Sequence, residues 1–386
     1  MAKVGDDSQK RQKRLNPVKG GAFAFITSGG HRLPSLYRPA RLTNPTGEGK
    51  ADMNALEEAL KKLEARAEEQ REKAKQEGRP TLSVVKRRMV ESSVKIAATL
   101  PDDILFQHTV FCQTVLPFRD PGSEVRTWQR QQGTATLQLE AGYAKDPQGL
   151  FVPVGLPFGP AARLILCHLN TEALQTGCPV IDVKDSLTAF VARLQGFRPN
   201  GQQIRKFKDQ LTRLSASTMR LAVDRDGYSI QKNMHIVSEF TLWAERFEGE
   251  RFLVPQHIAL SAEYFESLQA HAVPLDERAV AALAHSAMGL DVYMWLAQRL
   301  HRVDPQRGQF IPWAALHAQF GQGYNRIRDF RRVFLSALRA VKTQYPQARM
   351  RTDKGGLMLG QSKPPVLPRP LVVALPPPPP PSPSKP

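Results

Sequence analysis

The chain has little cysteine, and its cysteines do not form a metal-binding pattern. Its 386 residues include three, Cys112, Cys167 and Cys178, with no CxxC pair among them. An odd number without that spacing indicates neither a disulfide framework nor a zinc knuckle. We therefore interpret all three as buried free thiols, and the sequence predicts no metal site and no cofactor.

Catalytic signatures are missing as well. The only Gly-Lys pair, Gly49-Lys50, is followed by Ala51, so there is no phosphate-binding Walker loop. The nine histidines form no HxH or HExxH, and GxSxG is absent. We interpret Asp102-Asp103, which precede Ile104, as a helix N-cap. The sequence therefore predicts a binding protein without enzymatic activity, and a nicking enzyme with an unrecognised site stays open as an alternative.

Long apolar runs and negative charge are also scarce. No run approaches the roughly 20 apolar residues that cross a bilayer, and the N-terminus lacks a signal peptide's apolar core, so we expect a cytoplasmic protein. Lys and Arg number 54 against 36 Asp and Glu, a net charge of +18. Such a charge attracts polyanions. Nucleic acid is the favoured partner, and a membrane surface is the second choice.

A short basic segment occurs twice, at residues 204–208 (IRKFK) and, 327 − 204 = 123 residues later, at residues 327–331 (IRDFR). In a helix, Ile and Phe three residues apart lie on one face, while the flanking Arg and Lys project elsewhere. The residues that continue this apolar face are Leu211, Leu214, Phe334, Leu338 and Val341. Each copy therefore predicts an amphipathic helix with a basic outer side.

The surroundings of the two copies are alike. A shorter helix precedes each one and ends at a glycine turn, at residues 196–201 in the first case and 321–323 in the second. A β-hairpin follows each one, pairing residues 218–223 with 228–237, and 348–352 with 357–359. Helix, turn, longer basic helix and hairpin is the layout of a winged helix, in which the longer helix enters the major groove.

Other segments have simpler patterns. We predict a helix from about residue 81 to 96, strands at 109–116, 134–140, 180–182 and 251–261, and helices at 155–174, 264–271 and 277–302.

The predicted fold class is α+β with two tandem winged-helix domains. We divide the chain into a disordered basic arm (1–50), a charged helix or linker (51–79), a first winged-helix domain with N-terminal strands (80–262), a second winged-helix domain (263–363) and a Pro-rich disordered tail (364–386). The arm either adds phosphate contacts or only solubilises the chain. The charged helix is either solvated or a short dimer seam. The tail is either a docking peptide or a stiff solvated segment.

Three segments resemble the plasmid RepA-type replication initiators. Residues 111–119 (FCQTVLPFR) resemble that family's strand motif, residues 154–160 (VGLPFGP) with 163–166 (RLIL) its next block, and residues 185–190 (DSLTAF) the start of its helix-turn-helix. The resemblance covers roughly residues 80–300. It implies binding to direct repeats (iterons) at a plasmid origin, opening of adjacent AT-rich DNA, and recruitment of a host initiator and the replicative helicase. It also implies copy-number control through a balance of monomer and dimer.

Double-stranded DNA is thus the expected partner, and each candidate contact is a basic or amide side chain. For base contacts we select Gln202, Gln203, Arg205, Lys206 and Arg213 in the first long helix, and Asn325, Arg328, Arg331 and Arg332 in the second, with Arg326 as a further contact. For phosphate contacts we select Lys208, Arg225, Lys232, Arg351 and Lys354. Any single one could instead belong to a solvated helix face. A tandem winged-helix repressor would use the same helices and stays open beside the initiator.

Overall fold

The computed structural model describes residues 83–367, apart from residues 133–134, 147, 196–198, 226–227 and 248–249. The predicted basic arm, the predicted charged helix and most of the predicted tail lie outside this part of the chain.

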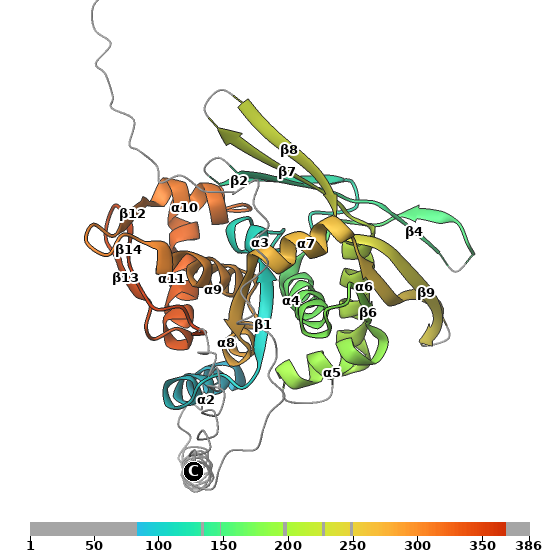
Figure 1. Cartoon of the computed structure of the whole chain (residues 1–386), viewed down its shortest axis with the longest axis horizontal. Coiled ribbons are helices and arrows are strands. Elements are labelled where there is room, and N and C mark those ends of the chain that lie inside the picture. Colours follow the sequence, from blue (N-terminus) through green and yellow to red (C-terminus); the bar gives the residue numbers. More distant parts are fainter. Residues whose placement is uncertain are drawn as a thin grey trace, which may run out of the picture.

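The first half of the described chain mixes helices with strands; α4, α5 and α6 lie together on one side of the molecule, and α2 lies apart from them beside α8 and α11 (Figure 1). Its elements are α2 (Val84–Ala98), β1 (Ile104–His108), α3 (Thr109–Gln113), β2 (Thr127–Gln132), β3 (Ala135–Glu140), β4 (Tyr143–Lys145), β5 (Phe151–Pro153), α4 (Gly159–Thr176), β6 (Val180–Asp182), α5 (Lys184–Gln195), α6 (Gly201–Ala216), β7 (Thr218–Arg225), β8 (Tyr228–His235), β9 (Val237–Phe247) and β10 (Glu250–Leu260).

The second half is mainly helical and carries one small sheet. Its elements are α7 (Ala262–His271), β11 (Ala272–Asp276), α8 (Glu277–Leu283), α9 (Ala287–Arg299), the 3-10 turn η2 (Leu300–Arg302), β12 (Gln309–Pro312), α10 (Trp313–Phe320), α11 (Ile327–Gln344), β13 (Arg349–Thr352) and β14 (Gly356–Gly360). The chain therefore has the α+β class that the sequence predicts.

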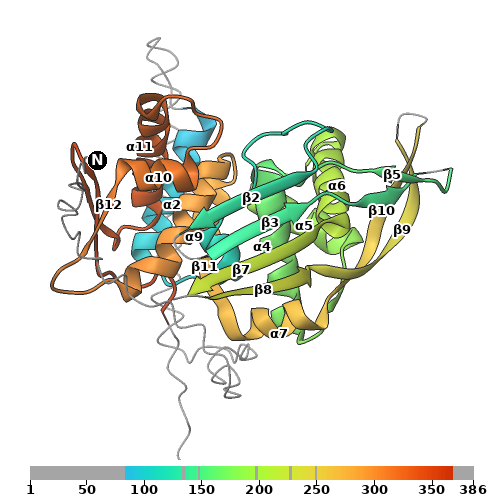
Figure 2. The ribbon, with the colours of Figure 1, turned by 90° about the horizontal axis from the view of Figure 1, so that it is seen from above.

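Two three-stranded sheets have the same strand order. The first is β6-β10-β9 and the second is β12-β14-β13, so in each the strand before the helix pair lies next to the last strand of the following hairpin. A four-stranded sheet, β2-β3-β7-β8, is added to the first half (Figure 2). Its edge strands touch α10 and α7, and it thereby joins both halves.

The hairpin expected to form the first wing belongs to a different sheet. Strands β7 and β8 do form a hairpin after α6, but β7 pairs along its length with β3. The hairpin that pairs with β6 is β9–β10, the counterpart of β13–β14 in the second half. Sequence alone could not separate two successive hairpins, because pairing between strands distant in the chain decides which sheet each one joins.

Residues 109–116 are not the predicted strand, and Asp102-Asp103 do not cap a helix. The strand lies earlier, at β1, which pairs antiparallel with β11. The next residues form the short buried helix α3, where the His108 ring nitrogen Nδ1 accepts a hydrogen bond from the Val110 backbone N–H (3.2 Å). Helix start signals that depend on a side chain of this kind override β propensity.

Three other boundaries also differ from expectation. The predicted helix 277–302 is divided into α8 and α9, because Ser286 begins a new helix by accepting from the Gly289 N–H (3.0 Å). Strands β2, β4, β5, β9, β11 and β12 were not predicted. The packed chain continues past Lys363, so the predicted tail begins too early: the Val366 side chain is 2% exposed.

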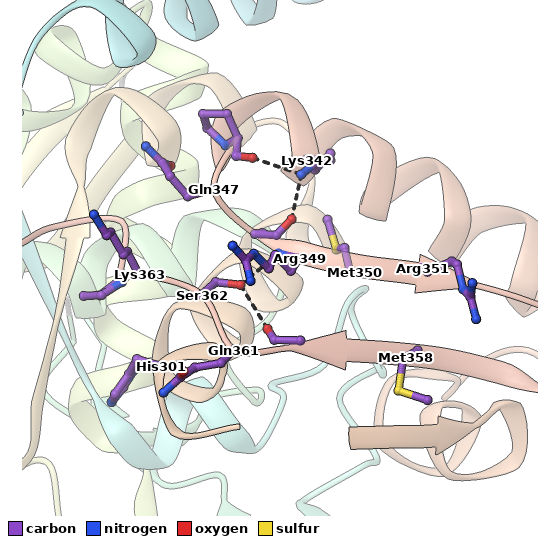
Figure 3. Close-up of a pocket in the computed structure, with 14 residues that line it drawn as sticks. His301, Lys342, Gln347, Arg349, Met350, Arg351, Met358, Gln361, Ser362 and Lys363 are labelled. Atoms are coloured by element: carbon purple, nitrogen blue, oxygen red, sulfur yellow. Dashed lines mark hydrogen bonds between the residues drawn. The ribbon is translucent and has the colours of Figure 1, made fainter. Parts of the chain in front are cut away.

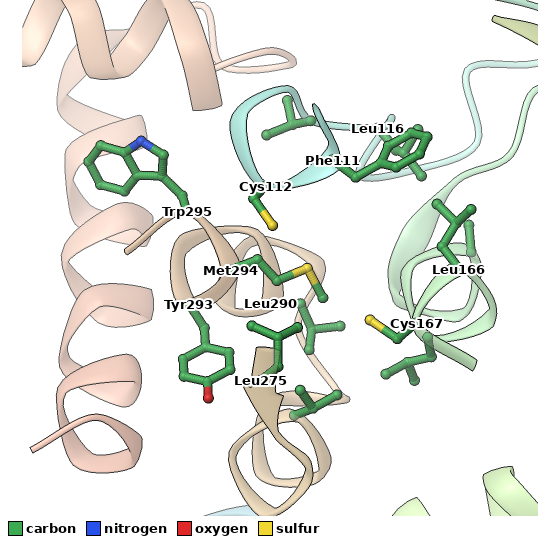
Figure 4. Close-up of a cluster of buried hydrophobic side chains, with 14 of the residues drawn as sticks. Phe111, Cys112, Leu116, Leu166, Cys167, Leu275, Leu290, Tyr293, Met294 and Trp295 are labelled. Atoms are coloured by element: carbon green, nitrogen blue, oxygen red, sulfur yellow. The ribbon is translucent and has the colours of Figure 1, made fainter. Parts of the chain in front are cut away.

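One continuous apolar core joins the two halves. Side chains from α3, α4 and α9 point into the same cluster, among them Cys112, Cys167 and Met294 (Figure 4). Burial raises the pKa of both thiols, that of Cys167 to about 12, so they are inert at neutral pH. The prediction of buried thiols is wrong for Cys178, which is exposed.

A buried ion pair also crosses between the halves. Arg163 on α4 and Asp291 on α9 meet in two bonds of 2.6 and 2.7 Å, and both side chains are less than 5% exposed. Nearby, the Tyr264 hydroxyl donates to the Asn170 side chain (2.9 Å). These contacts, together with the β1–β11 ladder, fix how the two halves sit against each other.

Candidate nucleic-acid interface

Helix α6 exposes its basic side and buries its apolar side. Asn200 accepts from the Gln203 N–H and the Gln203 side chain accepts from the Asn200 N–H, both at 2.9 Å, which forms a capping box. Phe207 is 7% exposed and packs into the core, as the repeat predicts. The outer side of the first two turns consists of the exposed residues Gln202, Arg205 and Lys206, with Lys208 half-buried.

Helix α11 repeats this arrangement. Phe330 and Phe334 are fully buried against the aromatic rings of α10 and of the turn before α11. Ile327 was expected on this apolar face, but it is 45% exposed, because the helix begins there and its first residue extends beyond the core. The exposed residues at its N-terminal end are Asn325, Arg326, Arg328 and Arg332.

The turn between α10 and α11 is held closely. The His317 ring contacts the Tyr324 carbonyl (3.0 Å), and a side chain at Gly321 would meet that ring at 2.4 Å. Glycine is thus required at Gly321 by close approach rather than by backbone angle. The short connection sets the direction in which α11 leaves α10, and so places its basic end at the surface.

Among the selected base-contacting residues, Gln203, Arg213 and Arg331 each contact a partner inside the protein. Gln203 forms the capping box. Arg213 bonds Asp209 (3.0 Å) and the Leu156 carbonyl (3.3 Å). Arg331 lies over the Trp313 ring at 4.6 Å. Arg213 therefore supports the 155–158 segment rather than presenting a free guanidinium, which is a correction to its selection as a base reader.

Two of the candidates for phosphate contacts belong to the β13–β14 hairpin of the second three-stranded sheet. Arg351 on β13 and Lys354 in the following turn are both exposed. The turn is fixed by Asp353, whose Oδ1 accepts from the N–H groups of Gly355 (2.7 Å) and Gly356 (2.8 Å). Arg225 and Lys232 lie on the β7–β8 hairpin, and their side chains are outside the part that the structure describes.

Two exposed cations near this sheet were missed by sequence reasoning. Arg349 lies two residues before Arg351 on β13, so the two side chains share one face of the strand. That period of two was a usable signal for Arg349. Lys363 had no such signal, because it follows β14 and was taken as the end of the ordered chain.

Strongly perturbed titrating groups lie in the core rather than among these exposed cations. Burial lowers the pKa of His108 to about 3 and that of His168 to about 4. Burial also raises the pKa of Glu277, which Arg193 opposes from 2.6 Å. Within the described ranges no three His, Cys, Asp or Glu side chains are grouped closely enough to hold a metal ion, and no described helix is long and apolar enough to span a bilayer.

Comparison with known proteins agrees with the resemblance found in the sequence. The family described as plasmid encoded RepA protein matches residues 156–315, from the segment before α4 to α10. Residues 156–315 are similar to this family, and the predicted resemblance to the RepA-type initiators is confirmed over them. The match supports assignment of the chain as a replication initiator.

Two similar solved structures are of RctB. Two crystal structures of domains 2 and 3 of RctB, one a selenomethionine derivative, are 11% and 10% identical to this chain. The match to the first covers 64% of this chain and 95% of that chain, with a TM-score of 0.42. The match to the second covers 64% of this chain and 94% of that chain, with a TM-score of 0.38. No match is found among curated protein sequences.

Proposed function

We propose that this protein starts plasmid replication by binding direct repeats at the origin, with α6 and α11 each entering the major groove of duplex DNA. One observation carries the proposal. Two long helices bury a phenylalanine at the same point of a repeated segment and expose arginine and lysine beside it. Exposed Arg and Lys at the N-terminal end of such a helix suit the acceptors on guanine.

The order of elements supports a winged helix in each half. The sequence α4-β6-α5-α6-β9-β10 corresponds to α9-β12-α10-α11-β13-β14, with β7–β8 inserted after α6. In both, the longer basic helix comes second in the helix pair, which is the recognition position of this motif. The β9–β10 and β13–β14 hairpins would then form the wings.

The arrangement of the two helices suits one continuous site. In Figure 2, α6 and α11 lie at opposite ends of the molecule and toward the same edge. Helices placed in this way can read two successive major-groove segments about one helical turn apart from one side of the duplex. A monomer would thereby read a long repeat, and self-association would not be needed for specificity.

Further steps of initiation follow from the family. We propose that binding to several repeats opens the adjacent AT-rich segment, and that the host initiator and the replicative helicase then join. Copy number would be limited by a balance of monomer and dimer. The protein needs no catalytic group for these steps, since the free energy of DNA binding opens the duplex.

Base reading is tested with Arg328→Ala. Its guanidinium is exposed at the start of α11, so we expect a loss of about 1–3 kcal/mol in specific binding, roughly 5- to 150-fold in Kd, with unchanged folding. Fluorescence anisotropy with a footprinted origin repeat and with a scrambled duplex measures both affinities. The matched control is Arg339→Ala, an exposed arginine farther along α11, for which we expect less than threefold change. An equal loss on both duplexes for Arg328→Ala would make it a phosphate contact.

Origin opening separates an initiator from a repressor, which the same helices would serve. Supercoiled origin plasmid is treated with permanganate, which oxidises unpaired thymines, in the presence and absence of the protein. We expect protein-dependent reactivity in the AT-rich segment beside the repeats. Protection of the repeats with no reactive thymines would indicate a repressor, and strand breaks in the untreated plasmid with metal present would indicate a nicking enzyme.

A further inference from the structure

A basic groove follows β13 of the second small sheet and extends over part of β14 and the segment after it. We call it the β13 groove. It has a volume of about 1140 Å³ and lies between the C-terminal end of α11 and the segment that follows β14 (Figure 3). Arg349, Arg351 and Lys363 line it, together with Met350 and Met358.

The charged side chains that line the β13 groove are all positive. Arg349, Arg351 and Lys363 are exposed, and no carboxylate occurs among the lining residues or pairs with these three cations in the described part of the chain. Lys342 also lines the groove, but its ammonium is occupied by the carbonyls of Pro346 (2.9 Å) and Ala348 (2.6 Å). The three exposed cations therefore remain available to a negatively charged ligand.

The floor of the groove is set by the strand register. Arg351 is opposite Met358, and Arg349 is opposite Gly360, so these four positions share one face of the sheet. Because Gly360 has no side chain, the face is hollow beside Arg349; a Cβ there would lie 3.1 Å from the Cβ of Arg349. Met358 supplies a flexible apolar surface next to this hollow.

The backbone of β13 is open on the groove side. Its pairing is with β14 only, within the described residues. The Asp353 N–H bonds the Gly356 carbonyl (3.0 Å) and the Arg349 N–H bonds the Ser362 hydroxyl (2.8 Å), so these alternate groups point toward β14. The N–H and C=O groups of Met350 and Thr352 therefore point the other way, toward the groove. An extended peptide can pair with such an edge.

We propose that the β13 groove binds an extended acidic segment of a partner protein, which adds as a strand to β13 and places its carboxylates against Arg349, Arg351 and Lys363. The four residues of β13 span about 13 Å, enough to pair with four residues of the partner. Single-stranded nucleic acid fits less well, because no aromatic side chain lines the groove to stack on a base. This inference goes beyond the proposed DNA reading and does not depend on it.

The groove is tested with full-length protein and a fluorescein-labelled octapeptide of alternating Glu and Thr, followed by anisotropy. We expect saturable, salt-sensitive binding by the native protein and none of the corresponding Lys-Thr peptide. The double variant Arg349→Glu/Lys363→Glu should bind at least tenfold more weakly. Its matched control, Lys86→Glu/Lys95→Glu, reverses two exposed charges on α2 and should change the affinity less than twofold.

A second pair of variants tests strand addition. Thr352→Pro removes the N–H on the open edge of β13 and leaves the bonds to β14 intact, so we expect about fivefold weaker peptide binding. Thr352→Val keeps this N–H, so we expect unchanged affinity.

Equal binding by native protein and the Arg349→Glu/Lys363→Glu variant would overturn the proposal. So would displacement of the peptide by a 20-residue oligo-dT that itself requires Arg349 and Lys363. Binding of an origin repeat, for which α11 is a proposed reader, is measured with the same variants. That measurement reports separately on the proposed function.

Discussion

At the scale of single residues, Arg163 shows how a charge is accommodated in the core. All five of its donor positions are used: two on the Asp291 carboxylate, and three on the carbonyls of Leu116, Pro117 and Gly159. It therefore fixes the loop before α4 as well as the contact with α9. The sequence block 154–166 that resembles the RepA family contains this arginine, so the resemblance there has a structural cause.

Removing the partner of Arg163 should be costly. Asp291→Asn leaves a buried guanidinium uncompensated, and we expect the free energy of unfolding to fall by about 3–5 kcal/mol in urea titrations. The control is Arg87→Ala, which breaks an exposed pair with Glu91 and should change it by less than about 1 kcal/mol. The double variant Arg163→Met/Asp291→Leu should not restore native stability, because it also removes the hydrogen bonds that Arg163 donates to the carbonyls of Leu116, Pro117 and Gly159. Full recovery would show that the ion pair alone matters there.

Stability should also depend on pH through two buried histidines. The pKa is about 3 for His108 and about 4 for His168, below the usual 6.5 of the unfolded chain. The folded state disfavours the protonated ring, so each neutral histidine contributes to the free energy of unfolding. This contribution is complete above pH 6.5 and is lost as the pH falls toward the pKa values of the folded state. We expect about 1 kcal/mol per histidine to be lost between pH 7.5 and 5.5. His168→Gln should remove its share, and an unchanged pH slope in that variant would contradict this account.

At the scale of elements, the two basic helices α6 and α11 were predictable and their surroundings less so. The 3.6-residue period predicts α6 from the sequence alone, and the structure adds the Asn200 cap at its start. The predicted strand 109–116 is wrong because Thr109–Gln113 is buried on all sides, and an entirely buried segment has no period that distinguishes a helix from a strand. Arg213 shares this limit: its spacing placed it on the basic side of α6, but only the packed 155–158 segment shows what it bonds.

A close contact between elements can be tested at Gly142. It follows β3 at the C-terminal end of α6, and a Cβ there would lie 1.9 Å from the Ala216 carbonyl oxygen. Gly142→Ala must therefore move β3 away from α6, and we expect a loss of about 1–3 kcal/mol in thermal or urea unfolding. Gly149→Ala, where the added atom meets nothing within 4 Å, is the control and should lose about 1 kcal/mol from its φ of +86°. Equal losses would indicate that the contact relaxes without cost.

At the scale of the whole molecule, the two halves pack against each other through a shared core. The core cluster is continuous, β1 pairs with β11, and Arg193 on α5 bonds Glu277 on α8 at 2.6 Å. The spacing of α6 from α11 is consequently fixed before DNA is met. In the proposed function, a rigid spacing would lower the entropy lost on DNA binding and would favour repeats of matching length.

Such coupling predicts a single unfolding transition. In differential scanning calorimetry we expect one peak, with equal calorimetric and van't Hoff enthalpies, because neither half keeps its core once the other has melted. Asp291→Asn, which acts at the contact between the halves, should lower the whole peak. Two separate peaks in the native protein would mean that the halves fold independently and that their spacing on DNA is adjustable.

The sequence by itself determined the local features: the helical period of the two basic helices, their glycine turns, the hairpins after them, and the resemblance to RepA-type initiators. These depend on residues close together in the chain, where spacing alone decides which side chains share a face. Only the tertiary structure decided which hairpin completes the first small sheet, which arginines are engaged internally, and that β13 has an open basic edge. Those outcomes depend on contacts between residues far apart in the chain, and no local sequence pattern predicts them.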